Sequence, residues 1–322
     1  MYNYTNVLYR LTLWGKVMSL LQFAKDKTLS PLKENEFKLE KDLQNFCEEN
    51  LTSLLDLTLV KSEFSIEGYR FDTLCFDESN KSFVIIEYKR GTNYSVIDQG
   101  YAYLGTMLNN KAEFILEYNE RLNKNLKRDD VDWSQSKIVF ISQSFSKFQK
   151  ETINFKDLPI ELYELKRFEN DIISFTEIKG NRISESIKTI APSGELFEKV
   201  NKEIVTYTLD YHRALGSVES VELFEVFKDK VLEMIPELSM DYKKRYIAFK
   251  KDKKNIFDLL IQKSQLKLWL NVKIGELEDP KGIAKDVSNT GHWGNGDYEI
   301  IFDNDDNLEY ILSLIKEVYK KA

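Results

Sequence analysis

The sequence contains few of the residues on which several common active sites depend. It has two histidines, His212 and His292, and two cysteines, Cys47 and Cys75, in 322 residues. Neither pair has the spacing of a zinc finger or of a histidine-rich metal hydrolase, so these sites are excluded. The chain also lacks the Gly-x-Ser-x-Gly elbow of serine hydrolases and the Gly-x-x-x-x-Gly-Lys-Ser/Thr loop that cradles nucleotide phosphates.

Long hydrophobic runs are absent as well. No apolar stretch approaches the ~20 residues that a membrane helix needs. The apolar residues near the N-terminus are interrupted by Arg10 and Lys16, and no signal-peptidase site follows them. Met18 is an alternative natural start. We therefore expect a cytoplasmic protein without a membrane segment, in which both cysteines are buried free thiols.

The composition is that of a soluble globular protein. Hydrophobic residues make up 42% of the chain and charged residues 31%, and 322 residues are comfortable for two domains. The formal net charge of −7 argues against a protein that coats nucleic acid through charge alone. A local basic groove stays compatible with this charge, because carboxylates that bind a metal make a site acidic until the metal arrives.

Residues 83–91 read Phe-Val-Ile-Ile-Glu-Tyr-Lys-Arg-Gly and predict a strand that is covered on both faces. Because side chains alternate along a strand, Glu87 and Lys89 share one face, about 6.5 Å apart. An acid and an ammonium at the end of a buried strand can hold a metal and polarise a phosphate. They can equally be a solvated strand end, and this segment alone does not decide between the two.

The preceding segment favours the functional interpretation. Residues 71–77 also predict a strand, and the polar residues 78–80 form a turn, so the two strands read as a hairpin. Asp72 would share a face with core residues, which is costly unless a metal or hydrogen-bond donors compensate the charge. The hairpin would bring Asp72 across from the Glu87 end of its partner.

An Asp followed by Glu-x-Lys on the adjacent strand resembles the signature of the PD-(D/E)XK nuclease superfamily. Asp72, Glu87 and Lys89 supply these residues, and Phe71 stands where a Pro often precedes the Asp. Two further features match: an acid on the helix before the hairpin, and the Gln-xxx-Tyr of the RecB-like branch on the helix after it. The matching residues are Glu40, Gln99 and Tyr103.

The resemblance covers residues 36–178, and within this range the chain is similar to the RecB-like and NucS-like branches of the superfamily. It implies an α/β fold with a restriction-endonuclease-like core, in which helices flank a mixed sheet. It implies a phosphodiesterase that depends on Mg²⁺ or Mn²⁺, most simply a DNA endonuclease of defence or repair. Nucleic acid, DNA above all, is then the expected partner, and a homodimer stays open.

The resemblance also assigns roles to individual residues. Asp72 and Glu87 would bind the metal together with the carbonyl of Tyr88, and Glu40 would hold a metal-bound water or a second ion. Lys89 would orient or help to deprotonate the attacking water and stabilise the transition state. Gln99 would position Lys89 or a phosphate. The residues expected to contact nucleic acid are Arg90, Tyr103 and Trp293, the last in the glycine-rich loop 291–296.

Two other functions stay open at this point. The chain could be a noncatalytic nucleic-acid-binding protein on a nuclease fold, although an intact Asp72, Glu87 and Lys89 count against this. It could also be a scaffold protein in which the C-terminal part is active. The loop around Trp293 could likewise be a hairpin turn with an anchoring ring.

Hydrophobic periodicity divides the chain into four parts. Helices are predicted over residues 34–55, 95–108 and 196–215, and strands over 113–118 and 160–168, the latter at the outer edge of the sheet. A smaller α+β domain, in which helices flank a set of strands, is predicted at the C-terminus. The parts are an extension (1–33), the nuclease-like domain (34–178), a linker with a connecting helix (179–216) and the accessory domain (217–322).

Overall fold

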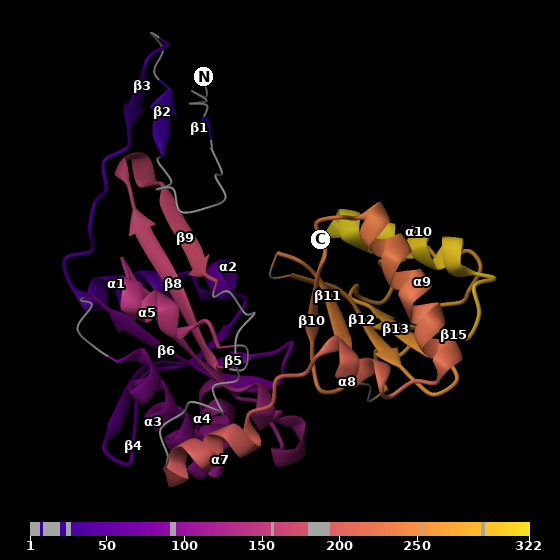
Figure 1. Cartoon of the computed structure of the whole chain (residues 1–322), viewed down its shortest axis with the longest axis horizontal. Coiled ribbons are helices and arrows are strands. Elements are labelled where there is room, and N and C mark those ends of the chain that lie inside the picture. Colours follow the sequence, from indigo (N-terminus) through magenta and orange to yellow (C-terminus); the bar gives the residue numbers. More distant parts are fainter. Residues whose placement is uncertain are drawn as a thin grey trace.

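The computed structural model (Figure 1) describes residues 7–8, 20–23, 27–90, 95–155, 158–179, 194–252, 254–290 and 294–322. Met18, His292 and Trp293 lie outside the described residues. Within these ranges no helix is long and apolar enough to cross a membrane.

The first half of the chain forms a mixed sheet, in which the described strands follow the order β4-β5-β6-β7-β8-β9. β4, β5 and β6 are antiparallel neighbours, β7 and β8 continue the sheet in parallel to β6, and β9 is antiparallel to β8. The strands are β4 (Thr58–Ile66), β5 (Tyr69–Asp77), β6 (Ser82–Lys89), β7 (Lys137–Ser142), β8 (Ile160–Arg167) and β9 (Ile173–Ile178).

Helices cover both faces of this sheet, because the apolar run in β6 is buried on both sides. Phe83 and Ile85 belong to the core that contains α3 and α4, whereas Val84 and Ile86 belong to the core that contains α1 and α2. The predicted α/β class, a mixed sheet flanked by helices, is therefore confirmed. The helices are α1 (Glu40–Glu49), α2 (Leu51–Leu55), α3 (Val96–Asn109), α4 (Lys111–Leu122) and α5 (Lys147–Thr152), with α7 (Glu195–Glu203) packed against α3.

A second, antiparallel sheet follows, with its own hydrophobic core against α9 and α10. Its described strands have the order β10-β11-β12-β13-β15-β14. The elements are α8 (Leu209–Arg213), α9 (Val218–Met234), β10 (Ser239–Tyr242), β11 (Ile247–Lys251), β12 (Lys254–Ile261), β13 (Leu266–Leu270), β14 (Lys285–Asp286), β15 (Tyr298–Phe302) and α10 (Leu308–Lys321).

The two sheets meet at the turn of the β5–β6 hairpin. The hydroxyl of Tyr246, just before β11, donates a hydrogen bond of 2.5 Å to the carbonyl oxygen of Ser79. Figure 1 shows the second sheet with its helices as a separate lobe beside the first. The remaining described elements are 3-10 turns at Arg128–Asp130, Trp133–Gln135 and Glu169–Asp171, and a small sheet of β1 (Val7–Leu8), β2 (Leu21–Phe23) and β3 (Leu29–Pro31).

Residues 113–118, predicted as a strand, are part of helix α4. Phe114, Ile115 and Tyr118 are buried whereas Leu116 is exposed, which is the spacing of one helix face rather than the alternation of a strand. The prediction was wrong because a short apolar run fits both periods.

Three further predictions differ from the structure in where an element begins, where it lies in the sheet or whether it is continuous. The predicted helix over residues 34–55 begins at Glu40 and is interrupted at Asn50, where α1 ends and α2 starts. The strand predicted at the outer edge is β8, which lies between β7 and β9, so β9 forms the edge. Residues 196–215 form two short helices, α7 and α8, instead of one connecting helix.

Candidate functional site

The β5–β6 hairpin places Asp72 and Glu87 opposite each other, as predicted. Antiparallel pairing of the two strands runs from Asp77 and Ser82 to Thr73 and Ile86, so Asp72 and Glu87 are next in register. Here a side chain replaces a main-chain acceptor of the β5–β6 pairing. The main-chain N–H of Tyr88 donates a hydrogen bond of 2.9 Å to Asp72 Oδ2. The Asp72 carboxylate is thereby fixed against β6.

The neighbouring strand β4 is distorted beside Asp72. Glu63 adopts the left-handed backbone conformation, with φ of 56°, in the middle of the strand. As a result Ser62 bonds to Gln44 of α1 on one face of the sheet, whereas Phe64 packs against a ring of α4 on the other. Residues two apart in a regular strand share a face, so Glu63 reverses the alternation here.

The environment of Asp72 makes its negative charge costly. Glu87 is only 4% exposed. Burial, with the negative charge of Glu87 as the next contribution, raises the pKa of Asp72 from 3.8 to about 6. Two acids in such a place imply a compensating positive charge.

Three donors among the described residues lie around Glu87, and all three bind one of its two oxygens. Lys89 Nζ lies 2.7 Å from Oε1, Gln99 Nε2 lies 2.8 Å from it, and the Tyr103 hydroxyl lies 3.4 Å from it. Gln99 also donates to the Tyr103 hydroxyl at 2.8 Å. Burial and the charge of Glu87 raise the pKa of Tyr103 to about 12, so this hydroxyl stays protonated. The other Glu87 oxygen, Oε2, is buried and has no hydrogen-bond partner among the described residues.

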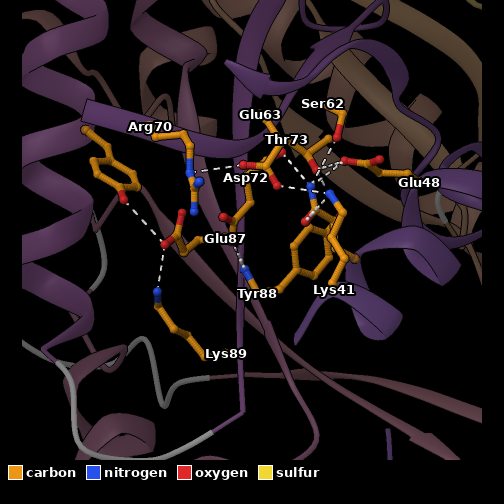
Figure 2. A network of polar contacts seen from close by, with 12 residues as sticks. Lys41, Glu48, Ser62, Glu63, Arg70, Asp72, Thr73, Glu87, Tyr88 and Lys89 are labelled. Atoms are coloured by element: carbon orange, nitrogen blue, oxygen red, sulfur yellow. Dashed lines mark hydrogen bonds and ion pairs between the residues drawn. The ribbon is translucent and has the colours of Figure 1, made fainter. Parts of the chain in front are cut away.

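The structure brings together five of the predicted residues: Asp72, Glu87, Lys89, Gln99 and Tyr103. Gln99 contacts Glu87, whereas the sequence suggested Lys89 or a phosphate as its partner. Figure 2 shows the Asp72, Glu87 and Lys89 side chains in one cluster, where the pairing of β5 with β6 ends.

Glu40 and Arg90 lie together at the same end of β6. The Glu40 Oε1 accepts a hydrogen bond of 3.0 Å from the main-chain N–H of Arg90, and the Glu40 side chain is otherwise exposed. The role of Glu40 at a metal, and the contacts of Arg90 and Tyr103 with nucleic acid, remain predictions. Trp293 lies outside the described residues.

A polar network that was not predicted from the sequence joins α1 to the hairpin. Gln44, which is buried, donates to the main-chain oxygen of Asp72 at 2.8 Å and to Glu48 at 2.9 Å. Glu48 in turn accepts a hydrogen bond from Thr73 (Figure 2). The signal was present in helical spacing, because Gln44 and Glu48 follow Glu40 at intervals of four residues.

A hard cation fits this site. Glu87 Oε2, which has no hydrogen-bond partner within the described ranges, and the Asp72 carboxylate offer oxygen ligands, which Mg²⁺ and Mn²⁺ prefer. The described part of the chain contains no group of three or more His, Cys, Asp or Glu side chains that could hold a metal. A cation here would therefore depend on Asp72 and Glu87, with main-chain and solvent oxygens completing its shell.

Comparison with known proteins found one family model and one curated relative. Residues 212–322 match a domain of unknown function (DUF5655). An uncharacterized protein of Haemophilus influenzae is 51% identical over 297 residues, which are 92% of this chain and 98% of that protein.

Two solved structures have a limited likeness to this chain. One is a repair endonuclease from Pyrococcus abyssi, with 12% identity and a TM-score of 0.25 over 49% of this chain and 65% of that one. The other is an EndoMS–dsDNA complex, with 12% identity and a TM-score of 0.23 over 50% of this chain and 65% of that one. The chain thus spans slightly less than two thirds of each structure.

We predict that Asp72→Asn holds or raises the melting temperature in EDTA. The amide keeps an acceptor for the Tyr88 N–H and removes the charge beside Glu87. Added Mn²⁺ should raise the melting temperature of the wild type by mass action and that of the variant much less. Calorimetry in EDTA and in Mn²⁺ measures both effects.

The matched control is Glu78→Gln, which changes an acid at the turn of the same hairpin and should respond to Mn²⁺ like the wild type. A large loss of melting temperature in Asp72→Asn, with an unchanged response to Mn²⁺, would indicate a purely structural carboxylate.

Proposed function

We propose that this chain, which belongs to one family with the Haemophilus influenzae protein, is a metal-dependent nuclease of the PD-(D/E)XK type. It would hydrolyse phosphodiester bonds, with DNA as the expected substrate and Mg²⁺ or Mn²⁺ as the cofactor. The resemblance of Asp72, Glu87 and Lys89 to the signature of this superfamily also implies a role as an endonuclease in defence or repair.

One observation carries the proposal. The Asp72 carboxylate lies next to Glu87, and the three donors around Glu87 all bind Oε1, so that the buried Oε2 has no hydrogen-bond partner among the residues that the structure describes. A carboxylate that merely stabilised the fold would be expected to have both oxygens satisfied, because unsatisfied buried charge is costly. An acceptor that is held in place but unused is what a cation site requires.

The residues divide the work according to their positions. Asp72 and Glu87 would hold the metal, which when bound lowers the pKa of a water and offsets charge on the phosphate. Lys89, whose Nζ lies 2.7 Å from Glu87 Oε1, would orient the attacking water and stabilise negative charge that develops on the phosphate oxygens. Gln99 and Tyr103 hold the Glu87 carboxylate in its orientation from α3.

We expect the protein to cleave DNA in Mg²⁺ or Mn²⁺, and to bind DNA without cleaving it in Ca²⁺. The reason is that a site of oxygen ligands accepts all three ions, while Ca²⁺ has a looser geometry and polarises water less. Gel assays with labelled DNA and RNA measure cleavage, and Glu87→Gln should abolish it. Glu78→Gln, at the far end of the hairpin, is the control that should remain active.

Activity that persists in EDTA would contradict the proposal. Binding of nucleic acid in Ca²⁺ without cleavage in any metal would instead favour a noncatalytic binding protein.

A further prediction concerns Lys89, which separates chemistry from binding. Lys89→Ala should lose roughly 10²–10⁴ in single-turnover rate, because it removes the group that orients the water. Metal affinity should persist because both carboxylates remain. Lys89→Arg should restore the rate only in part, since a planar guanidinium cannot replace a compact ammonium.

The matched control is Lys81→Ala, since Lys81 forms a similar ion pair with Glu78 at the hairpin turn. Single-turnover cleavage is compared with equilibrium binding in Ca²⁺. A Lys89→Ala rate near that of the wild type, or a loss of binding in step with the loss of rate, would show that the assigned role is wrong.

A further inference from the structure

The left-handed residue Glu63 lies directly beside the carboxylate pair. Its neighbours Ser62 and Phe64 are paired with Thr73 and Phe71, which places Glu63 opposite Asp72. A φ of 56° is uncommon for a residue with a side chain, and it persists only where the surroundings stabilise it. Such distortions are concentrated at sites that bind ligands, where they redirect a side chain.

The redirected Glu63 carboxylate holds two cations from different elements. Lys41 Nζ of α1 and Arg70 Nε of β5 each lie 3.0 Å from one of its oxygens, as Figure 2 shows. The hydrogen bond from Lys41 is the largest effect that lowers the pKa of Glu63, so this carboxylate is ionised at neutral pH. Two positive charges are thereby fixed around one negative charge at the edge of the site.

Arg70 is the member of this trio that is best placed to meet a substrate. It precedes Asp72 by two residues in β5, so their Cα atoms are about 6.6 Å apart. Its side chain is 69% exposed, and the ion pair with Glu63 engages Nε. An arginine carries further N–H donors in a planar fork that matches phosphate oxygens.

The site needs such a cation. The two carboxylates repel a phosphodiester backbone, and Lys89 is engaged with Glu87. A metal would offset charge at the reacting phosphate but not along the strand that continues beyond it. An exposed ion pair by itself adds little stability and would not explain a strained backbone in the middle of a strand.

We infer that Arg70, oriented by Glu63, binds a backbone phosphate of the nucleic-acid strand next to the phosphate that is cleaved. This inference rests on the proposed nuclease function and adds a substrate-binding residue to it. Arg70 would position the strand without touching the reacting atoms. Its loss should therefore weaken binding more than it slows the chemical step.

The experiment compares wild type, Arg70→Ala and Arg70→Lys in binding a fluorescein-labelled DNA duplex in Ca²⁺ over a range of salt concentrations. Losing one phosphate contact should reduce the slope of log affinity against log salt by about 0.9, and weaken binding about fivefold at roughly 0.15 M salt. Arg70→Lys should keep the slope, because the charge remains, with an affinity between the other two.

The matched control is Arg121→Ala. Arg121 also pairs through Nε with a glutamate, Glu117, and its side chain is 56% exposed, but it lies on α4. Its slope and affinity should equal those of the wild type. Single-turnover cleavage at saturating DNA in Mg²⁺ should be largely retained in Arg70→Ala.

The possible failures are distinguishable. If the wild type binds and cleaves DNA but Arg70→Ala has the wild-type affinity and slope, the inference about Arg70 is wrong and the nuclease function stands. An equal loss in Arg121→Ala would likewise reduce Arg70 to a nonspecific surface charge and overturn the inference. If the wild type does not bind nucleic acid, both the nuclease function and this inference are wrong.

Discussion

Two negative charges in a poorly hydrated place are the constraint around which the first sheet is organised. Asp72 and Glu87 lie side by side where β5 and β6 cease to pair, and burial together with the negative charge of Glu87 makes the charge of Asp72 costly. The protein compensates only in part. Asp72 accepts a hydrogen bond from the Tyr88 N–H, and Glu87 Oε1 accepts hydrogen bonds from Lys89 and Gln99. Glu87 Oε2 accepts none from the described part of the chain. The remaining cost is what a bound cation would relieve.

Both helical layers contribute to holding this pair in place. On one face, Gln44 of α1 donates a hydrogen bond to the main-chain oxygen of Asp72. On the other face, Gln99 of α3 donates a hydrogen bond to the carboxylate of Glu87. A site supported from rigid elements on both sides can keep two like charges close without separating the strands. The distortion at Glu63 and the exposed Arg70 lie at the rim of this rigid centre, where a substrate would arrive.

Much of this site could be predicted because strand periodicity and hairpin pairing are short-range rules. Alternation placed Glu87 and Lys89 on one face, and the polar turn brought Asp72 opposite. The rest depends on tertiary contacts. The reversal at Glu63 breaks the alternation on which prediction relies, and α4 was mistaken for a strand because its buried face is decided by packing against Phe64 and its neighbours.

The anomalous density of a crystal soaked in Mn²⁺ would show directly whether Asp72 and Glu87 hold a cation. We expect a peak between the carboxylates of Asp72 and Glu87, within coordination distance of Glu87 Oε2, and no such peak in the Asp72→Asn variant. Ordered Mn²⁺ elsewhere in the crystal with no density between these two carboxylates, or a peak that persists unchanged in the variant, would contradict this expectation.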